Sequence, residues 1–502
     1  MPTYLLGIDN GGTRTKAALF DATGREIASA GRDTPLSIPA EGFNERDMDI
    51  LWRETAAAVR EALSRAAVDP ALIAGVGCTG HGKGLYLWGK DGRPAYPAIA
   101  STDRRARPIV KAWREDGTEA LARRKTLQPL LESQPVALLR WLQQYKPEVL
   151  PNTRWIFEAK DYIRYRLTGE ARAEITDYSG TGLLNLLTGD FDRELLVLYG
   201  LTELWDKLPP KALSTDICGR ITAEAARDTG LTAGTPVCGG MFDIDACAIA
   251  MDVSRDDLLS VITGTWSINE YPSLTPIADD ATTRSSLFCV PGYYLIEESS
   301  PTSAGNLDWF ISRFLGKEAA QAEGKKSVYA LLDEWMAQAD PRDSDILFLP
   351  YLYGTNVEGC PRAAFLGMED AHTAKDLVQA VFEGVVFSHM IHIERLLHRR
   401  SAPPKAIRLA GGAAYSAPWI RMFADVTGFP VEAVDAGELG GLGCAMAAAV
   451  GTGIYRDYQE AAAAMVHISA PILPDPARTA VYRSKYVRYK QAVDALGSLK
   501  WT

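Results

Sequence analysis

A turn rich in glycine and threonine near the start of the chain could hold a phosphate group. Residues 10–16, Asn-Gly-Gly-Thr-Arg-Thr-Lys, lie between two short apolar runs, 4–8 and 17–20, and this pattern predicts a β-hairpin. Its tip would offer unhindered backbone N–H groups, threonine hydroxyls and the Lys16 ammonium, all of which bind phosphate. Asp9, at the end of the first strand, could hold a phosphate-bound Mg²⁺ directly or through water. The alternative is a hairpin that only reverses the chain.

The same design recurs in the second half of the chain. The apolar run 258–263 leads into Gly264-Thr265-Trp266-Ser267, which is again a turn of small and hydroxyl-bearing residues. Two halves that each open with a phosphate-type hairpin indicate a repeat on the scale of a domain.

An aspartate near the middle of the chain could act as a general base. Asp243 follows Gly239-Gly240 at a predicted strand-to-helix turn. Phosphoryl transfer to an alcohol needs a carboxylate that orients the hydroxyl and accepts its proton. An aspartate at such a turn can instead cap the next helix. Asp245, two residues further on, competes for either role.

Residues 77–83, Gly-Cys-Thr-Gly-His-Gly-Lys, match the GxxxxGK pattern of a phosphate-binding P-loop. A P-loop continues with Ser or Thr and then a helix, whereas Gly84 and the strand-like run 85–88 follow here. A loop of small residues with one imidazole, His81, and one ammonium, Lys83, fits a polyhydroxyl ligand better. A second glycine run, 440–443, lies in a helical context with no strand immediately before it, which favours close helix packing over dinucleotide binding.

Alternating strands and helices would have to position these groups. In the first half we expect a helix at 45–67 capped by Asp47 or Asp49, strands at 73–78 and 85–88, and helices at 136–145 and 155–167. In the second half we expect a hairpin at 258–271, more strands to 297, helices at 377–397, 419–427 and 440–451, and strands at 406–410 and 430–433.

The bulk composition limits the classes of function. A chain of 502 residues is too long for one core and suggests two or three domains. A net charge of −10 argues against a nucleic-acid surface. The seven cysteines form no CxxC pair, so neither a zinc site nor a disulfide framework is indicated. With no leader pattern and no apolar stretch of about 18 residues, we expect a cytoplasmic protein without a membrane span.

Five motifs, in order along most of the chain, resemble those of the FGGY carbohydrate kinase family, which belongs to the actin/hexokinase/Hsp70 ATPase superfamily. They are the two hairpin turns, the segment 239–243 that ends in Asp243, the segment Pro361-Arg362-Ala363-Ala364-Phe365-Leu366-Gly367, and 410–416, Ala-Gly-Gly-Ala-Ala-Tyr-Ser. The resemblance implies two RNase H-like α/β domains, 1–240 and 241–502, with a central cleft. It also implies ATP and Mg²⁺ as cofactors, with the nucleotide's phosphates between the two hairpins.

Individual roles follow from the resemblance, residue by residue. It implies that Asp243 is the catalytic base and that Asp9 and Asp243 hold Mg²⁺. Residues toward ATP would be Gly12, Thr13, Lys16, Gly264, Thr265, Gly305, Gly411, Gly412 and Ser416. Residues toward the sugar would be His81, Gly82, Lys83, Asp103 and Asp243. The sequence departs from the family where Gly12 replaces a common Thr and Arg14 a common Ser.

The loop Gly80-His81-Gly82-Lys83-Gly84 and the run 101–106, Ser-Thr-Asp-Arg-Arg-Ala, are most similar to the L-xylulose and 3-keto-L-gulonate kinase branch. We therefore expect ATP-dependent phosphorylation of a ketopentose such as L-xylulose. The alternatives are D-xylulose, ribulose, 3-keto-L-gulonate, glycerol or erythritol. A nucleotide-gated scaffold would need a peptide-binding domain, and a sugar-sensing regulator would need a DNA-binding segment. The expected partner is a small sugar, and we expect no nucleic-acid or membrane partner. The sequence leaves open whether the protein forms a homodimer.

Overall fold

The computed structural model describes residues 3–499, except 265, 279–282, 317–326, 358, 360 and 436. The chain folds into two compact units, each assembled from segments far apart in the sequence. The first unit comprises Met1–Ser254, Pro272–Leu295 and Ala436–Val466, and the second comprises Arg255–Tyr271, Ile296–Asp435 and His467–Thr502. The continuous domain limits expected from the sequence, 1–240 and 241–502, stay a prediction.

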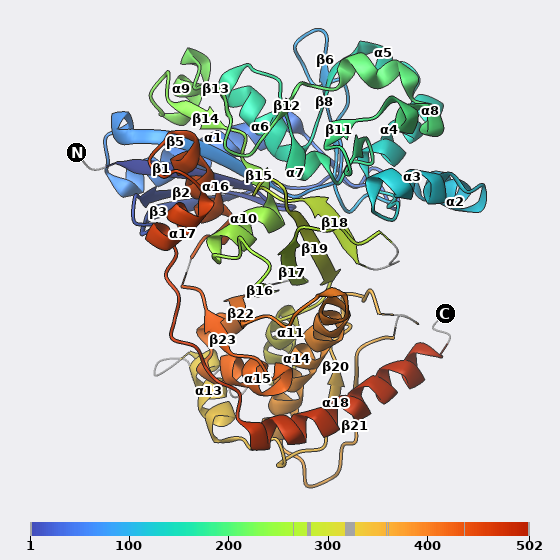
Figure 1. Cartoon of the computed structure of the whole chain (residues 1–502), viewed down its shortest axis with the longest axis vertical. Helices are drawn as coiled ribbons and strands as arrows, with labels where there is room; N and C mark the ends of the chain where they lie inside the picture. Colours follow the sequence, from blue (N-terminus) through green and yellow to red (C-terminus); the bar gives the residue numbers. More distant parts are fainter. Residues whose placement is uncertain are drawn as a thin grey trace. The chain divides into compact units, whose positions relative to one another are not determined.

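A mixed seven-stranded sheet forms the centre of the first unit (Figure 1). Six strands follow the order β13-β14-β5-β1-β2-β3, and β15 also pairs with β5. β2 runs antiparallel to both β1 and β3, whereas β5 is parallel to β1. The strands are β1 (Tyr4–Asn10), β2 (Arg14–Asp21), β3 (Glu26–Asp33), β5 (Ile73–Gly80), β13 (Ile217–Arg220), β14 (Pro236–Cys238) and β15 (Met241–Phe242).

The first predicted hairpin is confirmed, because β1 and β2 pair Asp9 with Lys16 and leave residues 11–13 as the tip. Successive side chains of β1 point to opposite faces of the sheet. Leu6 and Ile8 enter the hydrophobic core together with α1 (Met48–Ala66). That helix is also confirmed, and Asp47 caps it by accepting from the backbone N–H groups of Asp49 and Ile50.

The glycine run 440–443 lies in α16 (Leu439–Gly451), which packs against β1 and β5. A Cβ atom on Gly7 of β1 would lie 2.0 Å from the Gly441 carbonyl oxygen. A Cβ on Gly443 would lie 2.1 Å from the carbonyl oxygen of Ala246 in α10 (Asp243–Ala250). The backbone of α16 approaches both the sheet and α10 so closely that only glycine fits, which confirms the packing interpretation of this run.

One expectation for the first unit is wrong. Residues 155–167 are not one helix: β8 (Thr153–Phe157) pairs with β6 (Tyr86–Gly89), and α6 (Ala159–Thr168) follows. The aromatic side chains of β8 fit a strand once β6 supplies a partner. The rejection of a P-loop at residues 77–83 is confirmed, because β5 leads through the loop 81–85 into strand β6 rather than into a helix.

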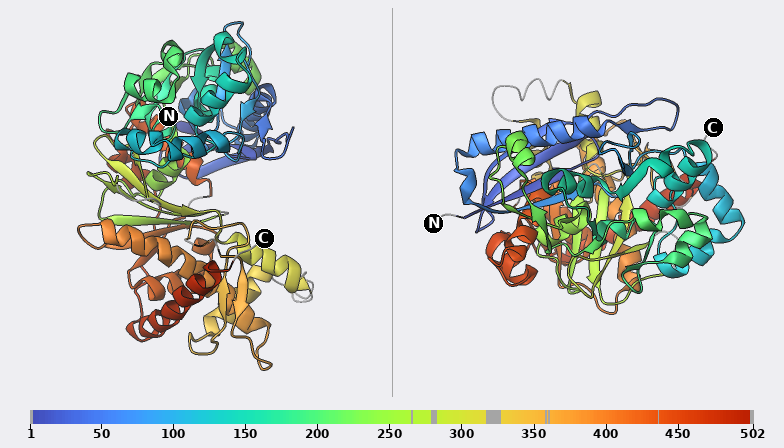
Figure 2. Two further views of the ribbon diagram at one scale, coloured as in Figure 1. Left: turned by 90° about the vertical axis from the view of Figure 1, so that its right-hand side faces the viewer. Right: turned by 90° about the horizontal axis from the view of Figure 1, so that it is seen from above.

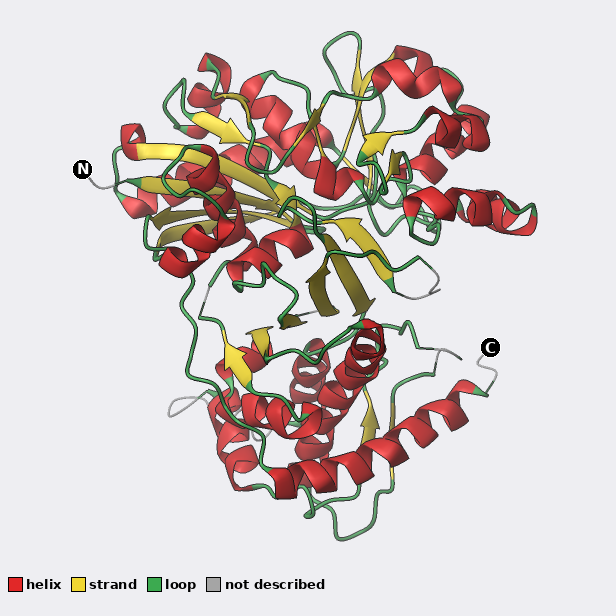
Figure 3. Ribbon diagram, viewed as in Figure 1, coloured by secondary structure: helices red, strands yellow, loops and turns green. Residues whose placement is uncertain are grey.

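The first unit also contains shorter strands and several helices, which Figure 3 colours by type. The strands are β4 (Glu45–Arg46), β7 (Ala98–Ile99), β9 (Ala173–Glu174), β10 (Leu184–Asn185), β11 (Asp190–Phe191), β12 (Lys211–Ala212) and β18 (Arg284–Leu287). The helices are α2 (Arg107–Glu115), α3 (Thr118–Thr126), α4 (Pro135–Tyr145), α5 (Val149–Asn152), α7 (Ile175–Tyr178), α8 (Arg193–Tyr199), α9 (Ala223–Thr229) and α17 (Tyr458–Met465). Short 3₁₀ helices are η1 (Pro70–Leu72) and η2 (Thr202–Lys207).

The second unit is built on strands in the order β19-β17-β16-β22-β23. The second predicted hairpin is confirmed as the antiparallel pair β16 and β17, and β22 runs parallel to β16. The strands are β16 (Leu258–Thr263), β17 (Ser267–Ser273), β19 (Tyr294–Ser300), β22 (Ala406–Gly411) and β23 (Val431–Ala433), with a separate pair β20 (Leu347–Leu349) and β21 (Ala364–Leu366).

Helices of the second unit include the predicted long helix, found as α14 (Ala374–Arg399), and α15 (Ala417–Thr427). The others are α11 (Gly305–Phe314), α13 (Val328–Gln338), η3 (Gly412–Tyr415) and α18 (Pro476–Gly497). α18, red in Figures 1 and 2, packs against α15. Within the described part of the chain, we find no helix with the length and apolar character to cross a membrane.

Candidate active site

The segment that ends in Asp243 is held from several sides within the first unit. Gly240 has a left-handed backbone with φ of 72°, and a Cβ there would lie 1.8 Å from the Cys78 carbonyl oxygen. The Thr79 hydroxyl donates to the Met241 carbonyl oxygen over 2.8 Å, and the pairing of β15 with β5 continues this contact. Arg164 donates to the Gly239 carbonyl oxygen over 2.6 Å. The chain before Asp243 therefore has a fixed course.

Asp243 is the first residue inside α10, and Phe242 occupies the N-cap position, so the capping alternative is wrong. Burial raises the pKa of Asp243 well above its ordinary value, the charges of Asp9 and Asp177 raise it further, and Lys83 opposes them. A carboxyl with a raised pKa is a stronger base than an ordinary aspartate. Asp245 is fully buried and its Oδ1 accepts from the Cys289 N–H over 3.0 Å, which is a structural contact.

A chain of buried hydrogen bonds reaches the residue before Asp243. The Phe242 N–H donates to the Thr176 hydroxyl over 2.9 Å. That hydroxyl donates in turn to Glu174 Oε2 over 2.7 Å, and Glu174 is paired with Lys160 at 3.2 Å. Thr176 is 1% exposed, so this hydrogen bond competes little with water. Thr176 therefore fixes the backbone that carries Asp243.

The tip of the first hairpin is open. Gly12 and Thr13 are exposed, and a Cβ built on Gly12 would meet nothing within 4 Å. The buried Arg46 donates through its guanidinium to the Gly12 carbonyl oxygen. This contact fixes the tip, and exposed backbone N–H groups at such a turn can bind an anion.

Lys16 lies one register pair from the tip, opposite Asp9, and its ammonium is 2.8 Å from Glu438 Oε2. Burial raises the pKa of Asp9 to about 6, Lys16 lowers it and Glu438 raises it. A Cβ on Gly440, the second residue of α16, would lie 2.9 Å from Asp9 Oδ2, so glycine there makes room for this carboxylate. The phosphate role of Lys16 and the metal role of Asp9 stay predictions.

The predicted sugar loop follows β5. His81 is buried, and its Nε2 lies 3.0 Å from the Tyr86 hydroxyl. Burial lowers the pKa of His81 to about 4, and the Arg46 charge adds to this, so the ring is neutral near pH 7. Lys83 has a left-handed backbone with φ of 65°, an uncommon conformation for a residue with a side chain. A Cβ on Gly82 would lie 2.4 Å from the Phe242 ring, so the loop abuts the Asp243 segment.

Asp103 is buried and already engaged by the protein. Its Oδ1 accepts from the backbone N–H and Nε of Arg105 at 2.8 and 3.0 Å. Its Oδ2 accepts from Arg105 Nη2 at 2.9 Å and from the Asn44 N–H at 2.7 Å. The predicted sugar contact of Asp103 would have to share these oxygens, and it stays a prediction.

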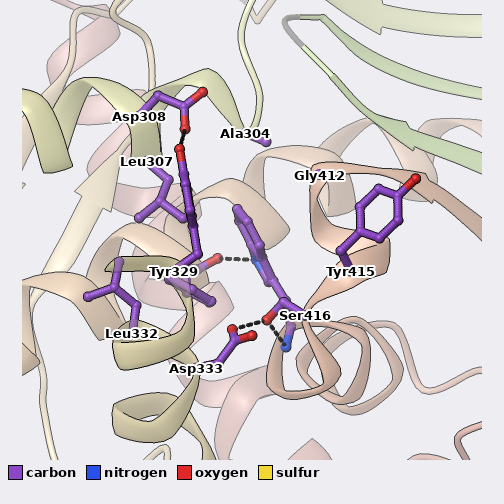
Figure 4. Close-up of a pocket in the computed structure, with 11 residues that line it drawn as sticks. Ala304, Leu307, Asp308, Tyr329, Leu332, Asp333, Gly412, Tyr415 and Ser416 are labelled. Atoms are coloured by element: carbon purple, nitrogen blue, oxygen red, sulfur yellow. Dashed lines mark hydrogen bonds between the residues drawn. The ribbon is translucent and has the colours of Figure 1, made fainter. Parts of the chain in front are cut away.

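The second unit contains a cavity of about 340 Å³ (Figure 4). Its walls are largely apolar and come from α11, α13, α14 and α15 together with η3. The lining residues are Ala304, Leu307, Asp308, Tyr329, Leu332, Asp333, Phe382, Gly412, Tyr415, Ser416 and Trp419. The Ser416 hydroxyl donates to Asp333 Oδ1 over 2.6 Å, and the Tyr329 hydroxyl donates to Asp308 over 2.8 Å. An apolar cavity with a few fixed polar groups suits a flat heterocycle.

The other residues predicted toward the nucleotide lie near this cavity or on the second hairpin. Gly412 and Ser416 line the cavity, and Gly411, with φ of 83°, lies at the end of β22. Gly305 is the first residue of α11, and Gly264 follows β16. Thr265 lies outside the described residues.

Several residues at these places were missed by reading the sequence. Arg46 and Thr176 hold the hairpin tip and the Asp243 segment, and Glu438 pairs with Lys16. Thr263, at the end of β16, accepts from the Ala413 N–H and donates to the Ala410 carbonyl oxygen, both over 2.9 Å. Thr263 and Glu438 adjoin glycine-rich runs in the sequence, whereas Arg46 and Thr176 do not, and the partners of all four are distant in sequence.

The described residues contain no group of three or more His, Cys, Asp or Glu side chains placed to hold a metal ion by themselves. Mg²⁺ in phosphoryl-transfer sites is usually held by one or two carboxylates together with the substrate's phosphates. Asp9 raises the pKa of Asp243, so the two carboxylates are close enough to repel each other. Such a pair fits a divalent cation, which would relieve that repulsion.

Comparison with known proteins places the chain among sugar kinases. Residues 4–250 match the N-terminal domain, and residues 259–452 the C-terminal domain, of the FGGY family of carbohydrate kinases. The L-xylulose/3-keto-L-gulonate kinase of Escherichia coli strain K12 is 37% identical over 499 residues, which cover 99% of this chain and 98% of that protein. The probable L-xylulose kinase of Pasteurella multocida strain Pm70 is 36% identical and covers 99% of both chains.

The solved structure of a ligand-bound xylulose kinase from Lactobacillus acidophilus is similar in fold, with a TM-score of 0.88 at 24% identity over 99% of both chains. This likeness confirms the predicted fold class, an α/β protein of two domains of the actin/hexokinase type.

Proposed function

The chain belongs to the FGGY family of carbohydrate kinases, and we propose that it transfers the γ-phosphoryl group of ATP to a hydroxyl of a ketopentose, with L-xylulose as the first candidate. The observation that carries this proposal is the setting of Asp243. Its pKa is raised well above the ordinary value, and it shares one unit with the sugar loop 81–84 and an open phosphate-type hairpin. The two relatives named for L-xylulose support the choice of sugar. A cytoplasmic location is part of the proposal.

In this mechanism Asp243 orients the sugar hydroxyl and takes its proton as the phosphoryl group moves. His81 and Lys83 bind the remaining hydroxyls, while Gly12 and Thr13 hold phosphate through backbone N–H groups and a hydroxyl. Gly412 and Ser416 line the cavity that takes the adenosine. Mg²⁺ bound to the phosphates would be held by Asp9 and Asp243 and would neutralise developing charge. Most of the acceleration comes from alignment and from the placement of charge.

A release assay tests the proposal. ADP formation is measured at fixed ATP across a panel of L-xylulose, D-xylulose, ribulose, 3-keto-L-gulonate, glycerol and erythritol. We expect release that depends on sugar and is fastest with L-xylulose. ADP release that depends on another member of the panel would reject L-xylulose as the substrate but would still support the sugar kinase activity. Slow release that no sugar accelerates would favour the nucleotide-gated scaffold, because such a protein hydrolyses ATP without a sugar acceptor.

Replacing Lys83 with alanine should raise the KM for the sugar by about tenfold and leave the KM for ATP within about twofold, because in this proposal the ammonium binds the sugar and not ATP. Steady-state kinetics with each substrate varied in turn measures both constants. Equal rises in the two KM values would assign Lys83 to the phosphate side.

Replacing Thr176 with valine should lower kcat by about tenfold with little change in either KM, because the Phe242 N–H and Glu174 lose their buried partner. The matched control is Thr176→Ser, which keeps the hydroxyl and should restore most of kcat. A valine variant with wild-type kcat would mean that β15 and the contacts from Thr79 and Arg164 position Asp243 without Thr176.

A further inference from the structure

A buried histidine ties together two segments of the second unit that are distant in sequence. His389 lies on α14 and is fully buried. Its Nδ1 is 2.8 Å from Asn269 Oδ1 and 3.0 Å from Ser267 Oγ, both on β17. Its Nε2 is 2.8 Å from Ser303 Oγ, in the loop before α11. The ring also packs edge-on against Phe423, with 5.5 Å between ring centres.

The contacts fix the ring's protons. The Asn269 amide nitrogen lies 3.2 Å from the Glu298 carbonyl oxygen, which can only accept, so Asn269 Oδ1 faces the histidine. Oδ1 is itself only an acceptor, so the proton of the neutral ring is on Nδ1. Burial lowers the pKa of His389 to about 3 and the neighbouring His392 adds to this, so the ring stays neutral. Nε2 therefore accepts from the Ser303 hydroxyl.

Both ends of this network border residues assigned above to the nucleotide. Ser267 is the first residue of β17 and follows the turn that contains Gly264. Ser303 immediately precedes Ala304, which lines the cavity, and lies two residues before Gly305. The network thus links the second hairpin with the start of α11, and α14 serves as the fixed support.

We propose that His389 is a positioning residue for nucleotide binding, which holds the second hairpin and the α11 loop at the separation that ATP requires. This inference rests on the proposed function, since it assigns those two segments to ATP. The simpler interpretation is a histidine that only fills the core, for which loss of the ring would lower stability without a selective effect on ATP.

His392, one turn later on the same helix, provides a matched control. It is equally buried, but its Nδ1 pairs with Glu298 Oε2 at 3.0 Å, and Glu298 lies on β19. A substitution there disturbs α14 to a similar degree without removing a contact to Ser267 or Ser303.

The experiment measures the Kd for ATP by calorimetry without sugar, together with the KM for each substrate and the thermal midpoint. His389→Ala should raise the Kd for ATP by about tenfold, which corresponds to the loss of one to two hydrogen bonds. The KM for the sugar should stay within about twofold of the value for the unmodified protein. His389→Asn, which can still donate to Asn269, should recover part of this loss. His392→Asn should leave the Kd for ATP within about twofold, whatever it does to the thermal midpoint.

An unchanged Kd in His389→Ala, or an equal rise in His392→Asn, would overturn the inference. If His389→Ala does not fold, Ser303→Ala decides: about a threefold rise in the Kd supports the network and no rise rejects it. Failure of the unmodified protein to bind ATP would instead reject the proposed function on which the inference rests.

Discussion

Asp243→Asn is expected to lower kcat by about a thousandfold or more, while the Kd for ATP stays close to that of the unmodified protein. An amide of the same shape can still accept a hydrogen bond from the sugar, but it cannot take the proton as the phosphoryl group moves. The side chain keeps its place because Arg164, Thr79 and Thr176 hold the segment before it through backbone atoms. Single-turnover kinetics and calorimetry with ATP measure the two quantities.

The raised pKa of Asp243 gives this prediction a second readout. The ionised form is the base, so kcat/KM should fall as the pH drops through the pKa of Asp243. Because burial and the charges of Asp9 and Asp177 raise that pKa, the acidic limb should lie well above the ordinary aspartate value of 3.8. Asp243→Asn should lose this limb from its residual activity. If Asp243→Asn retained full activity while Asp245→Asn lost its activity, the base would be Asp245.

The parts of the site that were predictable from sequence are those whose signal is local. The hairpin at 10–16 follows from apolar runs around a glycine turn, and Asp47 caps α1 by bonding to residues two and three places on. The engagement of Asp103 with Arg105 is equally local, since the partner is two residues away. The sugar role of Asp103 comes from the resemblance, which gives positions in a motif and not the partners of a side chain, and that role stays a prediction.

What sequence reasoning missed depends on contacts made across the fold. The predicted helix over 155–167 fails at its start because β6, the partner of β8, lies more than 60 residues earlier and nothing within 153–157 specifies that pairing. Thr176 is 66 residues from Phe242, and His389 is 122 residues from Ser267. A single threonine or histidine carries no periodicity, so its role appears only when the partner is brought beside it.

Gly240→Ala should destabilise the first unit by about 2–5 kcal/mol and remove most activity with it. Two costs add at this position. A residue with a side chain loses about 1–2 kcal/mol in the left-handed region, where φ of Gly240 is 72°. The new methyl would lie 1.8 Å from the Cys78 carbonyl oxygen, which belongs to the central strand β5 and cannot move away cheaply. The midpoint of thermal unfolding and the soluble yield measure the loss.

Gly234 separates the two costs, because its φ of 91° is also left-handed while a Cβ there would meet nothing within 4 Å. Gly234→Ala should therefore lose only about 1–2 kcal/mol and keep wild-type kcat, since the residue is exposed and precedes β14 rather than Asp243. The difference in lost stability between the two variants measures the free-energy cost of the steric contact between a methyl group at position 240 and β5. Equal losses would mean that β5 yields to the methyl group, and that Asp243 owes its position to the hydrogen bonds from Thr79, Arg164 and Thr176 rather than to close backbone packing.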